Sequence, residues 1–241
     1  MAALFLPCGD TGLTVQFGEG IDRDLNQRII RIRAAVDEAA IPGVIETVPT
    51  YRSLMIHYDP LRTSQAEIVE ALAPLLAPTS DDGAATGKHW RMPVCFDGEE
   101  FAADMAHVAE WANMAPAAII DIMTSVTHYV YMLGFAPGLP YMGDLPESLA
   151  IPRRKDPRHG VPPGSVLIAT GLTVIYPVTN ATGWHIIGRT PVPLFDVTAD
   201  DPVLLTPGDT MTLYRVNEAD FRAIEERVRA GTFEPERIST A

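Results

Sequence analysis

Gly134-Phe-Ala-Pro-Gly-Leu-Pro-Tyr141 is the densest part of the stretch that decides the fold of this 241-residue chain, which runs over residues 129–196. In that stretch, proline and glycine repeatedly separate short apolar runs that contain β-branched and aromatic residues. Proline fixes φ and glycine admits positive φ, so the pattern is typical of short strands joined by tight turns. Loops held on a rigid scaffold are common positions for binding sites, and we expect this stretch to carry both the scaffold and the site.

Strand-length apolar runs between residues 126 and 216 predict a closed or partly closed β-barrel. They cover residues 130–133, 166–169, 174–178, 184–187, 203–205 and 211–214. Alternating apolar residues at 90–96 predict one more strand. A helix is predicted from the spacing of Phe101, Met105, Val108 and Trp111 or Ala112. A short helix should follow from Pro116 to about Met123, and a last helix, capped by Asn217, should plug or brace the barrel.

The first 78 residues predict a separate small domain with the order β, β, α, β, β, α. Asp22 is the expected cap of its first helix, and Ser64 with Glu67 forms a capping box for the second. Residues 79–87 lack bulky apolar side chains and mix turn formers with acidic residues, which is typical of a linker. The predicted fold class is therefore α+β, with an N-terminal α+β sandwich domain at 1–78, a linker at 79–87 and a β-barrel domain at 88–241.

The net charge of −13 argues against nucleic acid as a partner, because nucleic-acid binding depends on clustered cations. The sequence has no run of about 18 apolar residues and its first residues lack the basic start of a signal peptide, so we expect a cytoplasmic protein without a membrane partner. Cys8 and Cys95 are too few for a disulfide framework and are interpreted as buried thiols.

The familiar motifs of nucleotide-binding loops, zinc proteases and nucleophile elbows are missing. The six histidines show no metal-ligand spacing, so we expect no metal site. His128 and His185 adjoin Tyr129 and Trp184 inside the organising stretch, where a ring nitrogen can orient a substrate or shuttle a proton near neutral pH. No catalytic nucleophile is identified, because Ser165 follows a glycine in a turn and is interpreted as capping that turn.

A basic cluster concentrates positive charge in this acidic chain. It consists of Arg153, Arg154, Lys155 and Arg158. Guanidinium groups suit carboxylate and phosphate oxygens, and Pro152 and Pro157 should stiffen the loop, so we interpret the cluster as an anion-binding loop. The alternative is that these cations pair with the protein's own Asp and Glu side chains.

The loop that opens the quoted stretch is a candidate neighbour of that anion. This loop would place backbone N–H groups and an aromatic wall beside the anion. The residues concerned are Gly134, Phe135, Pro137, Gly138 and Tyr141. The alternative for this loop is a plain corner of the barrel.

Taken together, these motifs resemble one family over nearly the whole chain. The matching residues are Gly134-Phe-Ala-Pro-Gly-Leu-Pro-Tyr141, Pro152-Arg-Arg154, Pro157-Arg158, Val161-Pro-Pro-Gly-Ser-Val166, Tyr176-Pro177, Gly183-Trp184, Ile187-Gly-Arg-Thr-Pro191, Gly9-Asp10, Phe17-Gly18, Asn26 and Tyr58-Asp59-Pro60. The family comprises the first subunit of bacterial allophanate hydrolase, the B subunit of the ATP-dependent 5-oxoprolinase and the kinase inhibitor KipI. The resemblance implies an N-terminal α+β domain followed by a cyclophilin-like β-barrel.

The resemblance also implies a function shared with a larger second subunit, similar to allophanate hydrolase subunit 2, the C subunit of 5-oxoprolinase or KipA. Such a pair resembles the carboxyltransferase half of urea carboxylase, whose site lies between two β-barrel parts. The implied reaction is ATP-dependent hydrolysis of 5-oxoproline to glutamate, or a carboxyltransferase reaction on urea or allophanate. ATP is then needed at the level of the complex, biotin only for carboxyl transfer, and neither is expected to be bound by this chain alone.

Under this implied function, Arg153, Arg154 and Arg158 would neutralise a phosphate or a substrate carboxylate, with Arg189 as a second clamp. The aromatic side chains of Tyr129, Tyr141, Tyr176 and Trp184 would form the pocket wall. The alternative function is a KipI-like inhibitor of a sensor histidine kinase, and a peptidyl-prolyl isomerase follows only from the type of barrel.

The chain departs from the family pattern at four places, one of which is Asn180-Ala-Thr182 in place of a Ser-Pro-Gly-like turn. Met123 stands where members usually have His, Leu172 stands where Gln is usual, and His185 stands where Gln is common. Two polar side chains are thus replaced by apolar ones, which implies a changed substrate or lost catalysis without affecting the expected fold.

Overall fold

The computed structural model describes residues 3–77 and 87–238. The chain divides into two compact units, Met1–Thr86 and Gly87–Ala241. The predicted linker, residues 79–87, lies outside the described residues except for Gly87. Within the described ranges, no helix is long and apolar enough to cross a bilayer.

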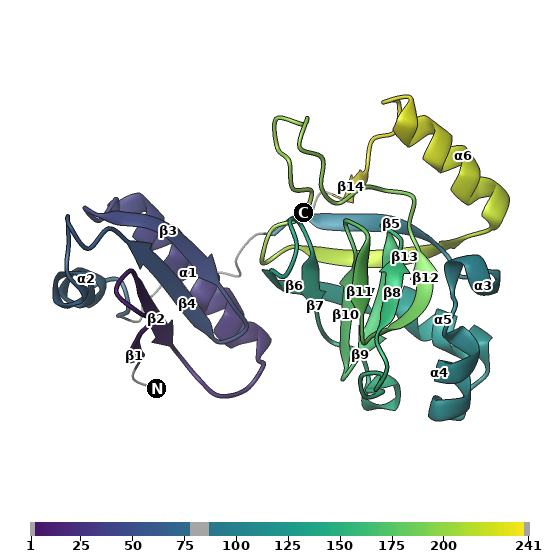
Figure 1. Ribbon diagram of the computed structural model, residues 1–241, viewed down its shortest axis with the longest axis horizontal. Coiled ribbons are helices and arrows are strands. Elements are labelled where there is room, and N and C mark those ends of the chain that lie inside the picture. The colour runs from purple at the N-terminus through teal and green to yellow at the C-terminus, as the bar shows by residue number, and fades with distance from the viewer. Residues whose placement is uncertain (1–2, 78–86, 239–241) are drawn as a thin grey trace. The chain divides into compact units, whose positions relative to one another are not determined.

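The N-terminal unit is a four-stranded antiparallel sheet that carries two helices (Figure 1). Its elements are β1 (Leu4–Pro7), β2 (Gly12–Gln16), α1 (Arg23–Ala39), β3 (Val44–Pro49), β4 (Ser53–Tyr58) and α2 (Gln65–Leu72), with the strand order β1-β2-β4-β3. The side chain of Asp22 accepts a hydrogen bond from the N–H of Leu25, and Ser64 and Glu67 form the predicted capping box. Apolar side chains of α1 and α2 pack on one face of the sheet, so this unit has a core of its own.

The C-terminal unit contains a closed barrel of seven strands, which confirms the predicted α+β class. The strands are β5 (His89–Cys95), β6 (Thr127–Leu133), β7 (Pro140–Met142), β9 (Ser165–Ala169), β10 (Leu172–Ile175), β12 (His185–Arg189) and β13 (Thr210–Val216). They follow the order β12-β9-β10-β7-β6-β13-β5, and the pair of Arg189 with Cys95 closes the ring between β12 and β5. Closure depends on Gly188, because a Cβ there would lie 2.7 Å from a methyl of Val94.

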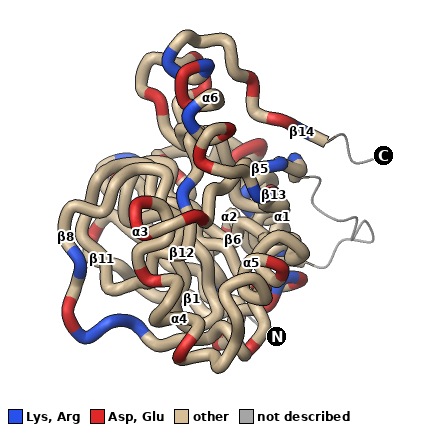
Figure 2. Tube along the Cα trace, turned by 90° about the vertical axis from the view of Figure 1, so that its right-hand side faces the viewer, with Lys and Arg blue, Asp and Glu red and all other residues tan. Residues whose placement is uncertain are grey.

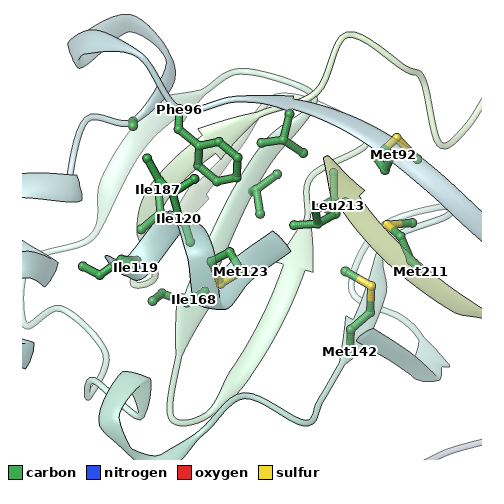
Figure 3. Packing of buried hydrophobic residues seen from close by; sticks show 14 of the residues in the cluster. Met92, Phe96, Ile119, Ile120, Met123, Met142, Ile168, Ile187, Met211 and Leu213 are labelled. Carbon is green, nitrogen blue, oxygen red and sulfur yellow. The ribbon is translucent and has the colours of Figure 1, made fainter. Parts of the chain in front are cut away.

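The barrel interior is a continuous apolar core (Figure 3). Met92, Met142 and Met211 enter it from three different strands, and Met123 enters it from a helix. Four helices and one 3-10 turn accompany the barrel among the described residues: α3 (Gly98–Phe101), α4 (Met105–Ala112), α5 (Pro116–Ser125), η1 (Glu147–Leu149) and α6 (Glu218–Arg229). Asn217 caps α6 as predicted, and Phe221 of α6 packs edge-on against Phe101 at 4.9 Å, so this helix braces the barrel wall.

The prediction of a single helix from the apolar stripe between Phe101 and Ala112 is wrong, because this segment forms two helices, α3 and α4. At the break the backbone turns to the barrel: the N–H of Asp104 donates to the carbonyl of Ile186 in β12 at 2.9 Å. The N–H of Asp104 thus donates its hydrogen bond to a strand and not to the preceding helical turn. The spacing of apolar residues does not reveal such a change of hydrogen-bond partner.

The structure contains four short strands that the sequence pattern did not predict, and it lacks one strand that the pattern did predict. The unpredicted strands are β7, β8 (Arg158–Val161), β11 (Asn180–Thr182) and β14 (Glu236–Ile238). β8 and β11 form a separate two-stranded ribbon, and β14 adds to β5. The run at 203–205 makes only an isolated bridge from Val203 to Phe195, because prolines at 202 and 207 flank it and lack the N–H that a ladder needs. Cys95 is buried as expected, but Cys8 is exposed, which corrects that expectation.

Candidate functional site

An aromatic pocket of about 280 Å³ lies on the outer face of the barrel. The outward position follows from strand alternation: Val174 of β10 lines the pocket, whereas the next residue, Ile175, belongs to the interior core. The lining residues are Phe135, Leu139, Tyr141, Arg153, Pro157, Val174, Tyr176, Ala181, Thr182, Gly183 and Trp184. The pocket therefore brings together the loop after β6, the basic loop, and strands β7, β10 and β11.

The walls of the aromatic pocket are two pairs of rings with one cation. Phe135 and Tyr176 have ring centroids 6.3 Å apart, and Tyr141 meets Trp184 in a T-shaped contact at 6.2 Å. The guanidinium carbon of Arg153 lies 5.5 Å from the centroid of the Trp184 ring. Burial raises the pKa of the Tyr141 hydroxyl, so this group is a neutral O–H near pH 7. The arrangement suits a small, flat, polar molecule that carries one negative charge.

Phe135 stands at the pocket in a strained conformation. Its φ is 70°, and its side chain is 67% exposed. Positive φ is unfavourable for an aromatic residue, and burial does not compensate for it here. Residues in strained conformations cluster at active sites and ligand clamps, and Phe135 both is strained and lines the pocket, so it is a binding candidate.

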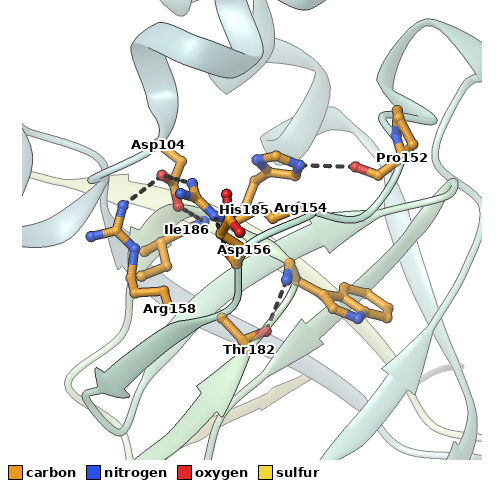
Figure 4. A network of polar contacts seen from close by, with 9 residues as sticks. Asp104, Pro152, Arg154, Asp156, Arg158, Thr182, His185 and Ile186 are labelled. Atoms are coloured by element: carbon orange, nitrogen blue, oxygen red, sulfur yellow. Dashed lines mark hydrogen bonds and ion pairs between the residues drawn. The ribbon is translucent and has the colours of Figure 1, made fainter.

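The basic cluster is held by a carboxylate that the sequence analysis did not identify. Asp104 is 3% exposed, and one of its oxygens accepts hydrogen bonds from Arg154 at 2.6 Å and Arg158 at 2.7 Å (Figure 4). Its second oxygen accepts from the backbone N–H of Ile186 at 2.9 Å. Arg154 and Arg158 thus pair with the protein's own acid, as in the alternative interpretation, and Arg153 is the arginine that lines the aromatic pocket.

Two more contacts fix the basic loop on the barrel. His185 is 2% exposed and its Nε2 lies 3.0 Å from the carbonyl oxygen of Pro152, while the N–H of Arg154 donates to the carbonyl of Gly183 at 2.7 Å. Burial lowers the pKa of the His185 ring, so the ring is neutral near pH 7 and Nε2 carries the proton that Pro152 accepts. In Figure 2 the loop is the blue stretch just before β8, interrupted by the acidic Asp156.

The remaining candidates lie elsewhere. His128 is fully buried, its Nε2 is 3.1 Å from the carbonyl oxygen of Met123, and burial lowers its pKa. Tyr129 is 1% exposed and packs edge-on against Tyr131 at 4.8 Å. Arg189 lines a different cavity beside α6, where its Nε donates to the carbonyl of Pro163. The structure therefore does not bring these three side chains to the aromatic pocket.

The other positions singled out in the sequence have backbone or packing roles. Gly138 has a φ of 72°, and a Cβ there would lie 2.9 Å from the carbonyl oxygen of Leu194, so it fixes the turn behind Phe135 while Pro137 is exposed. Met123 is fully buried in the barrel interior, and Leu172 packs at the edge of the outer apolar cluster. Neither of these two family departures lines the aromatic pocket.

Asp104 is the residue that sequence reasoning missed. It lies 50 residues before Arg154 and inside a stretch assigned to one helix. A signal was available, because an acidic residue before an apolar stripe is a common helix cap. The side chain makes no capping bond to α4 and is used instead to join β12 and the basic loop. Among residues 3–77 and 87–238, no group of three His, Cys, Asp or Glu side chains could hold a metal ion.

Comparison with known proteins gives a consistent result. Residues 3–205 match the family model of the carboxyltransferase domain, subdomain C and D. The 5-oxoprolinase B subunit of Bacillus subtilis (strain 168) is 34% identical over 232 residues, which are 90% of this chain and 95% of that protein. The crystal structure of TTHA0988 matches with a TM-score of 0.75 at 30% identity, over 86% of this chain and 40% of that one. The urea amidolyase of K. lactis shares the fold, with a TM-score of 0.79 at 21% identity, over 98% of this chain and 16% of that one.

Proposed function

The chain belongs to the family of the carboxyltransferase domain, subdomain C and D, and from this membership we propose that it is one component of a hetero-oligomeric, ATP-dependent amidohydrolase of the 5-oxoprolinase type. The observation that carries the proposal is the 34% identity to a 5-oxoprolinase B subunit over 90% of this chain and 95% of that protein. The reaction is 5-oxoproline, ATP and water to glutamate, ADP and phosphate. A urea or allophanate reaction is the second substrate choice, since a urea amidolyase shares the fold.

The aromatic pocket supports this choice of substrate. 5-Oxoproline is a small five-membered lactam with one carboxylate, and the pocket of about 280 Å³ offers flat aromatic walls and one guanidinium. The lactam would lie against Tyr141 and Trp184, and Arg153 would bind its carboxylate in a charge-assisted contact. Neutral Tyr141 can donate a hydrogen bond to the amide oxygen, which favours polarisation of the C=O bond.

A stable amide needs activation before water can open it. ATP would supply that activation by phosphorylating the amide oxygen, with ADP as the leaving group. Water would then add to the activated carbon, and the C–N bond would break with its electron pair and a proton going to the ring nitrogen. The resulting acyl phosphate would be hydrolysed by a second water to glutamate and phosphate. Among the described residues, those that line the pocket include no Ser, Cys, Lys, Asp or Glu, so the chain's own contribution is to bind and orient the lactam. Biotin would be required only for carboxyl transfer to urea. Arg153, the cation that lines the pocket, is assigned to the substrate carboxylate, so no step here involves biotin.

A larger second subunit is the proposed partner, similar to the C subunit of 5-oxoprolinase, allophanate hydrolase subunit 2 or KipA. In TTHA0988 and in K. lactis urea amidolyase, the part that matches this chain makes up 40% and 16% of a longer polypeptide. A segment that is covalently joined to other domains in those proteins is a reasonable member of a complex here.

The test is reconstitution. The chain is co-expressed with the candidate larger subunit, and ATP hydrolysis and glutamate release are measured with 5-oxoproline, urea or allophanate, with and without avidin. Glutamate release that requires ATP, both subunits and 5-oxoproline is the expected result. Turnover only with urea or allophanate, blocked by avidin, would replace the substrate. No complex, together with inhibition of a sensor histidine kinase by the chain alone, would favour the KipI-like alternative.

A further inference from the structure

A second cavity, which we call the loop cavity, lies on the other side of the basic loop and has a volume of about 550 Å³. Its walls come from α4, the basic loop and the start of β12. The lining residues are Asp104, His107, Trp111, Ile151, Pro152, Arg153, Arg154, Lys155, Asp156, Arg158 and His185. Arg153 lines both this cavity and the aromatic pocket, so the two are neighbours separated by the loop.

The loop cavity is positively charged in a protein of net charge −13. Four cationic side chains line it against two carboxylates, which leaves a local surplus of two positive charges. Asp104 holds two of the arginines side by side, with side chains 28% and 37% exposed, so they remain accessible to a ligand. Two rigid guanidinium groups in one place present N–H donors in the forked geometry that an oxyanion requires.

Several donors in the cavity are not committed to the protein. The Nε of Arg158 is buried and has no hydrogen-bond partner among the described residues. Lys155 forms no ion pair with any residue in the described ranges, although Asp156 is its neighbour in the chain. Buried polar atoms in folded proteins nearly always have a partner, so the Nε of Arg158 is a candidate donor to a molecule bound in the cavity.

His185 adds an acceptor to these donors. Its Nε2 donates to Pro152, which leaves Nδ1 as the lone-pair nitrogen, and Nδ1 is buried without a partner among the described residues. His107 stacks on the same ring with centroids 5.2 Å apart, so the orientation of the imidazole is fixed. A hydrogen-bond acceptor next to several cations suits an anion that also carries a hydrogen-bond donor, such as a phosphate with a P–OH group.

We propose that the loop cavity binds a phosphoryl oxyanion, with Lys155 and Arg158 on its oxygens and His185 Nδ1 accepting the hydrogen of its P–OH group. Asp104 is a positioning residue in this site, because it fixes the two guanidinium groups without contacting the anion. The ligand is a free phosphate or polyphosphate, or the terminal phosphate of a nucleotide whose base stacks on the 44% exposed ring of Trp111. The site belongs to this chain alone, so binding of a nucleotide here would replace the expectation that ATP is held only at the level of the complex.

Calorimetric titration of the full chain with pyrophosphate, tripolyphosphate and ATP tests the proposal. Lys155→Ala should weaken pyrophosphate binding by about five- to tenfold, because one charge-assisted contact is lost. Arg62→Ala is the matched control, since it removes one exposed cation from the N-terminal unit, and it should leave the affinity unchanged. Equal losses in the two variants, or no binding of any of these anions at millimolar concentration, would overturn the proposal.

Two further variants separate positioning from simple charge and identify the ligand's source. Asp104→Asn raises the net charge by one, so attraction by charge alone predicts tighter binding, whereas loss of positioning predicts weaker binding. Weaker binding with an unchanged circular dichroism spectrum is the expected result, and tighter binding would contradict the site. Trp111→Ala should weaken only ATP if the ligand is a nucleotide, and should leave ATP and tripolyphosphate equal if the ligand is the bare anion.

Discussion

Removal of the Asp104 side chain should destabilise the barrel unit more than the loss of an exposed ion pair. In Asp104→Ala, Arg154 and Arg158 lose their shared acceptor at 2.6 and 2.7 Å, and the N–H of Ile186 loses its acceptor at 2.9 Å. The Ile186 N–H remains in a residue that is 5% exposed, so water replaces its lost partner poorly.

The expected loss follows from these three bonds. Hydrogen bonds to charged groups contribute about 1.5–3 kcal/mol when buried, but both arginines are about one-third exposed, so each is discounted to about 1 kcal/mol. The unpaired backbone N–H adds about 1–2 kcal/mol. The free energy of unfolding of the barrel unit should fall by about 3–4 kcal/mol, which corresponds to a drop in Tm of about 6–15 °C for a domain of this size.

Urea unfolding followed by tryptophan fluorescence measures this change. All three tryptophans, Trp90, Trp111 and Trp184, belong to the unit Gly87–Ala241, so the signal reports the barrel unit. Asp97→Ala is the matched control: Asp97 binds Arg215 at 2.7 Å, but the side chains are 37% and 55% exposed, and the loss should be below about 1 kcal/mol. Equal effects of the two substitutions would refute the role assigned to Asp104.

Three other predictions follow from local features. Phe135→Gly removes a side chain held at a φ of 70° and should stabilise the barrel by up to about 1 kcal/mol while weakening lactam binding by the complex; lower stability in urea would contradict the strain. Burial lowers the pKa of His128 and His185 in the folded protein from the ordinary value of 6.5. As the pH drops below 6.5, these side chains are protonated in the unfolded chain before they are protonated in the folded one. The free energy of unfolding should therefore decrease by about 1.4 kcal/mol per pH unit for each histidine in that range. His128→Gln should reduce that slope, and an unchanged slope would show that His128 does not contribute. A fragment starting at Gly87 should keep the near-ultraviolet circular dichroism and Tm of the barrel, because the apolar clusters of the two units share no residue; a molten fragment would contradict separate cores.

Local chemistry made the fold predictable. Asp22, Ser64 and Asn217 cap helices where the sequence indicated, because a cap depends on residues within one turn. The barrel followed from the density of Pro and Gly between apolar runs. Strands of three or four residues, such as β8 and β11, were not predictable, since their pairing depends on contacts and not on periodicity.

The site was predictable only in part, because it depends on long-range contacts. Arg153 and Arg189 look alike in sequence, but one stacks on Trp184 at the aromatic pocket and the other lies over Phe221 of α6. The preference of Arg154 and Arg158 for Asp104 is likewise a contact across 50 or more residues. The sequence could name the cations, but only the fold shows which of them face a ligand.

Steady-state kinetics of the reconstituted complex test whether the aromatic pocket with Arg153 holds the amide substrate. Arg153→Ala should raise the KM for 5-oxoproline by about tenfold or more, since a charge-assisted contact to the carboxylate is lost. Arg189→Ala removes a guanidinium 5.7 Å from the Phe221 ring, in the other cavity, and should leave the KM unchanged. An unaltered KM in Arg153→Ala, or the same increase in both variants, would contradict the assignment.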